Sequence, residues 1–263
     1  MSRPTAVLRR DLNLGTTWLL PEWSSGPRGD EQAVLEAAVE AGYQGVQGAD
    51  PERCRALGLV PTTFDIRPES GGLVARARRW ADQGFACATL MVGTGMDDDD
   101  QAARLIEEVL EASSAAGIPL YVETHRATVT QDVWRTLQLV RRFPEIRFNG
   151  DFSHWYTGHD LPIGDFGAKL DALAPVFERT RYLHGRIGTS GSIQVDVGDG
   201  RNADEPPVSH FRALWTRAFA GFLASAPDDP VPAPGGAIGF APELLPAEFG
   251  YALRLPGADG VPR

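Results

Sequence analysis

The chain has 263 residues, of which 43% are hydrophobic and 23% are charged, an ordinary composition for a globular protein. Its formal net charge of −10 disfavours binding to the phosphate backbone of nucleic acids. No apolar run approaches the roughly 20 residues that a membrane span needs, and the N-terminal segment lacks the apolar core of a signal peptide. Two cysteines are too few for a disulfide framework or a thiolate zinc site, so we expect a reduced, cytoplasmic setting.

Runs typical of buried strands alternate with amphipathic helical runs along the whole chain. The strand candidates occupy residues 11–15, 43–48, 59–66, 85–93, 119–125, 146–152, 181–188 and 237–243. The helix candidates between them include residues 30–42, 97–117, 131–143 and 210–226, with a short helix expected near 51–58. The helical runs carry aromatic stripes that we expect to lie mostly in the core, formed by Trp134, Trp215, Phe219 and Phe222.

Eight strands that alternate with helices predict an α/β fold, a (β/α)8 TIM barrel that forms a single domain over residues 1–263. The alternative is an open doubly wound sheet, but the first strand leads into TTWLLPEWSSGPRG, which is not a Gly-rich dinucleotide turn. The C-terminal tail, 244–263, is irregular and rich in proline and glycine, so we expect the eighth helix to be short or missing. Without that helix, apolar surface on the outside of the barrel would need another cover, and a second copy of the chain in a homo-oligomer could supply it.

Polar side chains gather at the ends of the last four expected strands, where the active site of a TIM barrel lies. Glu123, Asp151, His184 and Glu243 each stand at such an end, and neighbouring strands lie about 4.8 Å apart. Three carboxylates and one imidazole around one point would repel one another without a cation. We therefore expect one divalent metal ion, Mn²⁺ in the first place, with Mg²⁺, Co²⁺, Fe²⁺ or Zn²⁺ as alternatives. Either carboxylate of the fifth and sixth strands, taken alone, is equally compatible with a helix cap or a salt bridge.

Further residues are expected around the substrate. Arg186 shares a strand face with His184 and is placed to bind an anionic or polar group, and His125 shares a face with Glu123. The loop 189–207 is long for a βα connection and suggests a lid, with Gln194 as a candidate contact. Trp18, in the loop after the first strand, is expected either to wall a pocket or to make an apolar contact at its rim.

An ordered set of short motifs resembles the xylose isomerase-like TIM barrel superfamily. The motifs are ETHR after the fifth strand, DFSHW after the sixth, HGRIG on the seventh and PE at the eighth. This superfamily includes sugar-phosphate isomerases and epimerases, ketose 3-epimerases, inosose dehydratases and endonuclease IV. The match spans essentially the whole barrel, and its specificity lies in the order and spacing of the motifs.

The resemblance implies roles for individual residues. It implies that the four strand-end residues bind one divalent metal ion and that Glu123 and Glu243 also serve as acid and base. The Asp-x-x-His pattern implies that His154 contacts substrate, although its strand parity lets it reach the site only if the sixth strand has already ended. Gly185 and Arg186 stand where several relatives carry an acidic residue. Five histidines and an acidic chain argue against the three-zinc chemistry of endonuclease IV.

These observations lead to a metal-dependent isomerase or epimerase as the first hypothesis. Its substrate would be a small polyol or keto-sugar, a polyhydroxy carbonyl compound that reacts through a metal-stabilised enediolate. The second hypothesis keeps the metal but makes the protein a lyase, a dehydratase or a tailoring enzyme of secondary metabolism. The third is a non-catalytic binding or partner subunit on the same scaffold.

Overall fold

The computed structural model describes residues 7–22, 24–66, 70–198, 201, 204–226, 229 and 232–251. Eight parallel strands close into one barrel in sequence order, with β1 hydrogen-bonded to both β2 and β8. The strands are β1 (Val7–Asn13), β2 (Gly45–Gln47), β3 (Val60–Ile66), β4 (Ala88–Met91), β5 (Leu120–Glu123), β6 (Phe148–Gly150), β7 (Thr180–Gly185) and β8 (Ala237–Pro242). The predicted (β/α)8 barrel is therefore confirmed, and each expected strand overlaps an observed one.

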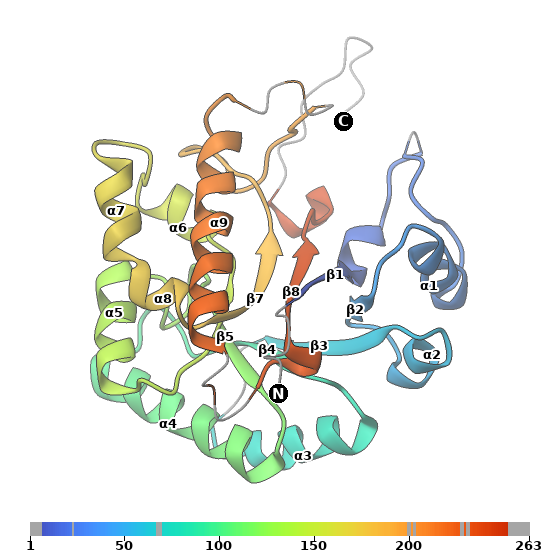
Figure 1. Cartoon of the computed structure of the whole chain (residues 1–263), viewed down its shortest axis with the longest axis horizontal. Coiled ribbons are helices and arrows are strands. Elements are labelled where there is room, and N and C mark those ends of the chain that lie inside the picture. The colour runs from blue at the N-terminus through green and yellow to red at the C-terminus, as the bar shows by residue number, and fades with distance from the viewer. Residues whose placement is uncertain are drawn as a thin grey trace.

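Helices surround this barrel on its outside (Figure 1). They are α1 (Glu31–Glu40), α2 (Pro51–Ala56), α3 (Leu73–Gln83), α4 (Asp99–Ala116), α5 (Val133–Arg142), α6 (Ser153–Gly158), α7 (Phe166–Ala172), α8 (Ala174–Phe177) and α9 (Val208–Ser225). Short 3₁₀ turns, η1 (Leu14–Thr17), η3 (Pro234–Gly236) and η4 (Ala247–Phe249), flank the first and last strands. Helix α9 packs against β7 and α8, while α3 packs against α4.

Local sequence signals explain where the long helix α4 begins and ends. Asp98 accepts a hydrogen bond from the Gln101 backbone, and the Gln101 side chain accepts one from the Asp98 backbone, which together form a capping box. Acidic residues in the first turn also suit the positive end of the helix dipole. At the other end Gly117 adopts the left-handed conformation, with φ of 66°, that terminates many helices.

Strand alternation divides the apolar residues into two layers. Val122, Phe148 and Leu183 point outward and join the large core between the sheet and the helices. The inward positions Tyr121 and Tyr182 form a small cluster inside the barrel together with Cys87 and Ala241. A Cβ added at Gly239 would lie 2.3 Å from the Tyr182 ring, so glycine on β8 leaves the space that this tyrosine fills.

The expected aromatic core is confirmed except at Trp134. Phe222 is buried, and Trp215 and Phe219 pack partly buried against the large core. Trp134 is 64% exposed, so its prediction as a core residue is wrong. Helix α5 buries Thr136, Leu139 and Val140. Trp134 precedes Thr136 by two residues, which is about 200° around the helix, so it lies on the opposite, exposed side.

Within the described residues, the outside of the barrel is incompletely covered where its first and last strands meet. After β8 the described chain continues through η4 to residue 251 without a further α-helix, which agrees with the expected short or missing eighth helix; 252–263 lie outside the described residues. Leu8, on the outer face of β1, is 46% exposed. No helix in the described parts of the chain is long and apolar enough to cross a membrane.

Candidate metal centre

Four acidic or imidazole side chains meet at the carboxyl-terminal mouth of the barrel. Glu123 is the last residue of β5, Asp151 follows β6, His184 lies in β7 and Glu243 follows β8. One donor atom from each of the four lies within 4.8 Å of the donor atoms of the other three, and all four residues are buried. The structure thus brings together the four residues that the sequence places at the strand ends.

His184 is held between carboxylates on one side and amides on the other. Its Nδ1 lies 3.3 Å from Glu123 Oε1 and 3.5 Å from Glu243 Oε2. Its Nε2 lies 2.8 Å from Gln47 Oε1, and because a carbonyl oxygen only accepts, this contact places a proton on Nε2. Burial alone would lower the pKa of His184, but the two glutamates raise it to about 9. The Nδ1 atom therefore either carries a proton that faces the carboxylates of Glu123 and Glu243, or directs its lone pair at a cation between them.

Arg186 brings a fixed positive charge into the same cluster. Its Nη2 donates to Asp151 Oδ2 at 2.6 Å and also to Glu243 Oε2. Burial raises the pKa of Asp151, but Arg186 and His154 outweigh it and hold that pKa well below its ordinary value. The Nε and Nη1 atoms of the guanidinium are buried and have no hydrogen-bond partner among the described residues.

The two glutamates have different surroundings. Asn13 Nδ2 donates to Glu243 Oε1 at 2.9 Å, whereas Glu123 Oε2 is buried without a hydrogen-bond partner in the described chain. Burial raises the pKa of both. His184 outweighs burial at Glu123 and leaves its pKa lowered, but at Glu243 burial prevails over His184 and Arg186 and leaves its pKa raised.

Two further histidines lie in tilted ring contact beside the carboxylates. The rings of His125 and His154 have centroids 3.8 Å apart. His154 Nε2 lies 3.3 Å from Asp151 Oδ2, but neither ring nitrogen has an aligned hydrogen-bond partner within the described residues. His125 Nε2 lies 3.3 Å from the hydroxyl of Tyr251. Burial lowers the pKa of both histidines, which favours neutral imidazoles.

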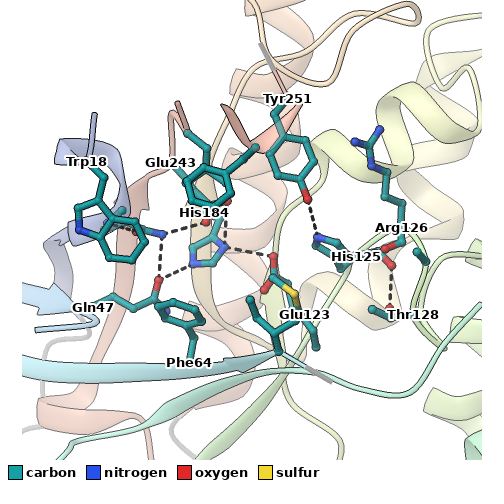
Figure 2. A pocket seen from close by; sticks show the side chains of 17 residues that line it. Trp18, Gln47, Phe64, Glu123, His125, Arg126, Thr128, His184, Glu243 and Tyr251 are labelled. Atoms are coloured by element: carbon teal, nitrogen blue, oxygen red, sulfur yellow. Dashed lines mark hydrogen bonds and ion pairs between the residues drawn. The ribbon is translucent and has the colours of Figure 1, made fainter. Parts of the chain in front are cut away.

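A cavity of about 370 Å³ opens above these residues. Glu123, His184 and Glu243 form its floor, and Trp18 contributes to its wall, one of the two roles expected for that residue. Figure 2 shows Trp18 and Arg126 on opposite sides of the carboxylates, with Tyr251 above them. The cavity lies at the low end of the roughly 300–1,000 Å³ range of small-molecule sites.

The side chain of Gln194, which is expected to contact substrate, bonds to the protein backbone in this structure. Its side-chain amide donates to the Leu245 carbonyl at 3.0 Å and accepts from the Leu245 N–H at 2.8 Å. Gln194 therefore fastens the loop 189–207 to the segment after β8, and it is not among the described residues that line the cavity. Thr157 Oγ1 also donates to the Thr189 carbonyl, so the loop is pinned to α6 at its start.

Several polar residues of the site were missed by sequence reasoning. Asn13, Gln47 and Asn149 lie at or near the ends of β1, β2 and β6 and converge beneath His184, where Asn149 Nδ2 lies 3.1 Å from its Nε2. The signal that could have found them is an amide at an inward-facing position near the end of a strand. Tyr251 comes from the irregular tail, where no periodic pattern predicts its position.

Comparison with solved structures identifies the architecture. A xylose isomerase-like TIM barrel protein from Mycobacterium smegmatis, in complex with magnesium, superposes with a TM-score of 0.55 at 15% identity over 92% of this chain and 91% of that chain. A probable 3-DHS dehydratase, AsbF, involved in petrobactin synthesis in Bacillus anthracis, gives 0.56 at 12% identity over 90% and 93%. The fold is that of the xylose isomerase-like TIM barrels. Endonuclease IV from Thermus thermophilus shares it, with 0.52 at 18% identity over 94% and 96%.

The similarity is one of three-dimensional structure. No family model and no curated protein sequence matches the chain. The resemblance inferred from the ordered motifs is thus confirmed as a shared xylose isomerase-like fold, and the chemistry depends on the side chains described above.

The residues in the mouth of this xylose isomerase-like barrel fit a divalent cation. Glu123 Oε2 has no hydrogen-bond partner in the described chain, and the Nδ1 of His184 is aimed at two carboxylates, so both atoms are available as metal ligands. An oxygen-rich set with one imidazole suits Mn²⁺, Mg²⁺, Fe²⁺, Co²⁺ or Zn²⁺. Asp151 and Glu243 would bind such an ion while they also accept hydrogen bonds from Arg186, because a carboxylate oxygen has more than one lone pair.

Proposed function

We propose that this protein is a divalent-metal-dependent isomerase or epimerase of a sugar or related polyhydroxy carbonyl compound. The observation that carries the proposal is the convergence of four buried donor side chains within 4.8 Å of one another, three of which, Glu123, His184 and Glu243, line an open cavity. Buried carboxylates are costly unless a cation or hydrogen bonds compensate them, so their concentration beneath a cavity favours a reactive site over a structural one.

Glu123, Asp151, His184 and Glu243 would hold the ion, Mn²⁺ being our first choice. A divalent ion bound there supplies Lewis-acid polarisation of the substrate carbonyl. Glu243 or Glu123 takes the proton from the carbon beside that carbonyl, which gives an enediolate. The other glutamate returns a proton on the opposite face or at the neighbouring carbon, giving the epimer or the isomer. Positioned acid–base groups of this kind contribute about 10²–10⁴-fold to a rate.

Arg186 and His154 orient the oxygen atoms of the substrate in this proposal. Both side chains carry buried nitrogen atoms without hydrogen-bond partners in the described chain, and a substrate hydroxyl or carbonyl would satisfy them. His125, whose Nε2 faces the hydroxyl of Tyr251, lines the cavity itself.

Solvent-deuterium incorporation tests the proposal. The Mn²⁺-loaded protein is incubated in D₂O with a panel of keto-sugars and inososes, and deuterium at the carbon next to the carbonyl is followed by NMR. We expect Glu243→Gln to abolish the incorporation seen in the wild type, while Glu111→Gln, at an exposed position on α4, leaves it unchanged. Full incorporation in Glu243→Gln contradicts a role of this residue in proton transfer.

A lyase or dehydratase is the second candidate, favoured by the unpaired Nε and Nη1 of Arg186. In such a reaction the same enediolate expels a substituent from the neighbouring carbon, and a guanidinium beside that carbon stabilises the departing oxygen. Product analysis separates the two: an unsaturated product with the loss of water or an alcohol indicates the lyase, and a product of unchanged mass indicates the isomerase.

The non-catalytic alternative makes a different prediction. A binding or partner subunit would need no divalent ion, so purified protein without a tightly held metal, together with no thermal shift on adding Mn²⁺, would favour it over both enzymes.

A further inference from the structure

The cavity above the four strand-end residues has walls of two kinds. Its floor is polar and consists of Asn13, Gln47, Glu123, His184 and Glu243. One side and much of the rim are apolar, formed by Trp18, Phe64, Ile66, Met91, Leu245 and Phe249. Small-molecule sites commonly combine a few placed polar groups with apolar walls, and the arrangement of the two kinds reports the shape of the ligand.

Strand alternation builds the apolar side. Phe64 and Ile66 lie two residues apart on β3, and Met91 ends β4, so all three point toward the barrel axis at its mouth. Trp18 follows η1, and its ring centroid lies 6.4 Å from that of Phe249 in η4. Segments far apart in the chain thus contribute to one apolar surface.

This apolar side is partly open to solvent. Ile66 is 59% exposed, Phe249 51% and Trp18 45%. Scattered apolar side chains are normal on protein surfaces, but a contiguous group that rims a concave site marks a binding surface. Each of these side chains would gain free energy if a ligand removed it from water.

A polyhydroxy carbonyl compound alone uses the floor and the polar side that His125, Arg126, Thr128 and Tyr251 form, and it leaves the apolar side unused. A hydroxyl buried against Phe64, Ile66 or Met91 would lose its hydrogen bonds to water without replacement, because these side chains offer no strong donor or acceptor. Hydroxyl and carbonyl oxygens are therefore best placed at the floor or the polar side, and the space beside the apolar side suits an apolar group that is attached to them.

We propose that the substrate is an amphiphile: a polyhydroxy carbonyl compound that carries an aryl or similarly planar apolar substituent, which packs against Trp18 and Phe64. The inference rests on the proposed function for the position of the ketone, and it adds the second half of the molecule. An aryl ring meets the flat faces of Trp18 and Phe64 in offset or edge-to-face contact, which favours it over an aliphatic chain.

Titration calorimetry on the Mn²⁺-loaded protein tests the inference with a matched pair of probes, phenyl and methyl 3-oxo-β-D-glucopyranoside. The two share one head group and differ only in the substituent. We expect the phenyl compound to bind about tenfold more tightly than the methyl compound. Equal affinity, within about twofold, overturns the inference.

Substitutions of Trp18 test whether this residue contacts the phenyl group. We expect Trp18→Ala to remove most of the preference for phenyl while changing the affinity for the methyl compound by less than about threefold, and Trp18→Phe to restore part of it. Trp134→Ala is the matched control, because Trp134 is exposed on the outside of α5. An equal loss of affinity for both probes in Trp18→Ala, or an undiminished preference for phenyl, contradicts the assigned contact.

The outcome also separates this inference from the function on which it rests. Preference for phenyl without deuterium incorporation supports the apolar subsite and overturns the enediolate chemistry. Deuterium incorporation into small keto-sugars without any preference for phenyl overturns the substrate class and supports the chemistry.

Discussion

The positive charge of Arg186 offsets part of the repulsion among the carboxylates of Glu123, Asp151 and Glu243. It joins Asp151 and Glu243 while its own side chain is 1% exposed. A buried ion pair is weak evidence for net stability, but the removal of one partner leaves an uncompensated buried charge. The arginine therefore allows the fold to hold three buried carboxylates before any metal ion binds.

Arg186→Met tests this role in the metal-free protein. We expect a loss of about 3–5 kcal/mol in the free energy of unfolding, because Asp151 and Glu243 lose their shared donor. Mn²⁺ should restore much of that stability, since it supplies the missing charge. Urea unfolding with EDTA and with Mn²⁺ measures both effects, and a variant as stable as the wild type in EDTA argues against the role.

Gln47 is expected to orient His184 rather than to bind the ion. Its Oε1 accepts from Nε2 and so leaves Nδ1 for the carboxylates or a cation. We predict that Gln47→Leu lowers the affinity for Mn²⁺ about 10–100-fold, as partners of this kind do in known metal sites. Competition with a fluorescent chelator gives the affinity; Gln131→Leu, in the loop before α5, serves as the control. An unchanged affinity in Gln47→Leu contradicts the orienting role.

Single residues of the site were predictable only where charge made them conspicuous. Glu123, Asp151, His184 and Glu243 are ionisable groups at strand ends, and alternation places them inside the barrel. Gln47 and Asn13 have the same inward placement, but a neutral amide at the end of a strand carries no comparable signal. The pairing of Gln194 with the Leu245 backbone could not be read from sequence, because it depends on how two loops meet.

At the scale of elements, Asp229, which follows α9, forms ion pairs at the amino-terminal ends of β6 and β7, the strands after or in which Asp151 and His184 lie. Its carboxylate accepts from Arg147, which precedes β6, at 2.7 and 3.0 Å, and from Arg181 of β7 at 2.7 Å. The Asp229 side chain is 1% exposed. Burial raises the pKa of Asp229, but the two arginines outweigh it and leave that pKa lowered.

The effect of Asp229 on stability should depend on pH. A carboxyl with a lowered folded-state pKa stabilises the fold at pH values above its unfolded pKa of about 3.9, and this contribution is lost as the pH falls further. We expect Asp229→Ala to cost about 3–5 kcal/mol at pH 7 and distinctly less at pH 3. Urea unfolding of both proteins across this range measures the difference; a difference that stays constant with pH contradicts the ionic origin.

Element type and order were predictable because strand and helix periods alternate clearly, whereas the ends of elements were not. The strand expected over 85–93 spans only Ala88–Met91. His154 has the wrong parity to follow Asp151 on a strand, and it reaches the site because α6 begins at Ser153 and its first turn brings the third residue after Asp151 back over the carboxylate. Trp134 was misplaced because it lies on the side of α5 opposite the buried Thr136, so a large apolar side chain alone does not show which face of a helix is buried.

At the scale of the whole molecule, the negative charge of the chain and the cluster of carboxylates at the carboxyl-terminal mouth of the barrel both favour the binding of cations. The net charge of −10 adds a general attraction to the local one. The barrel closes from strands that span the chain from Val7 to Pro242, so an ion held by β5 to β8 stabilises the fold as a whole. Self-association through the incomplete cover near β1 stays a prediction, which light scattering can test.

Metal binding should therefore raise the unfolding temperature of the metal-free protein. At a Mn²⁺ concentration about 100 times the dissociation constant, linkage gives about 2.7 kcal/mol, or several degrees for a domain of this size. We expect Asp151→Asn to lose most of the shift, and Asp171→Asn, an exposed position on α7, to keep it. A full shift in Asp151→Asn shows that the stabilising ion binds elsewhere.

The most direct test is a crystal structure of the protein soaked in Mn²⁺, with the ion located by its anomalous scattering. We expect one strong peak at the mouth of the barrel, within about 2.0–2.4 Å of one donor atom from each of Glu123, Asp151, His184 and Glu243. The absence of a peak there, with the four side chains arranged around Arg186 alone at saturating Mn²⁺, would contradict this expectation.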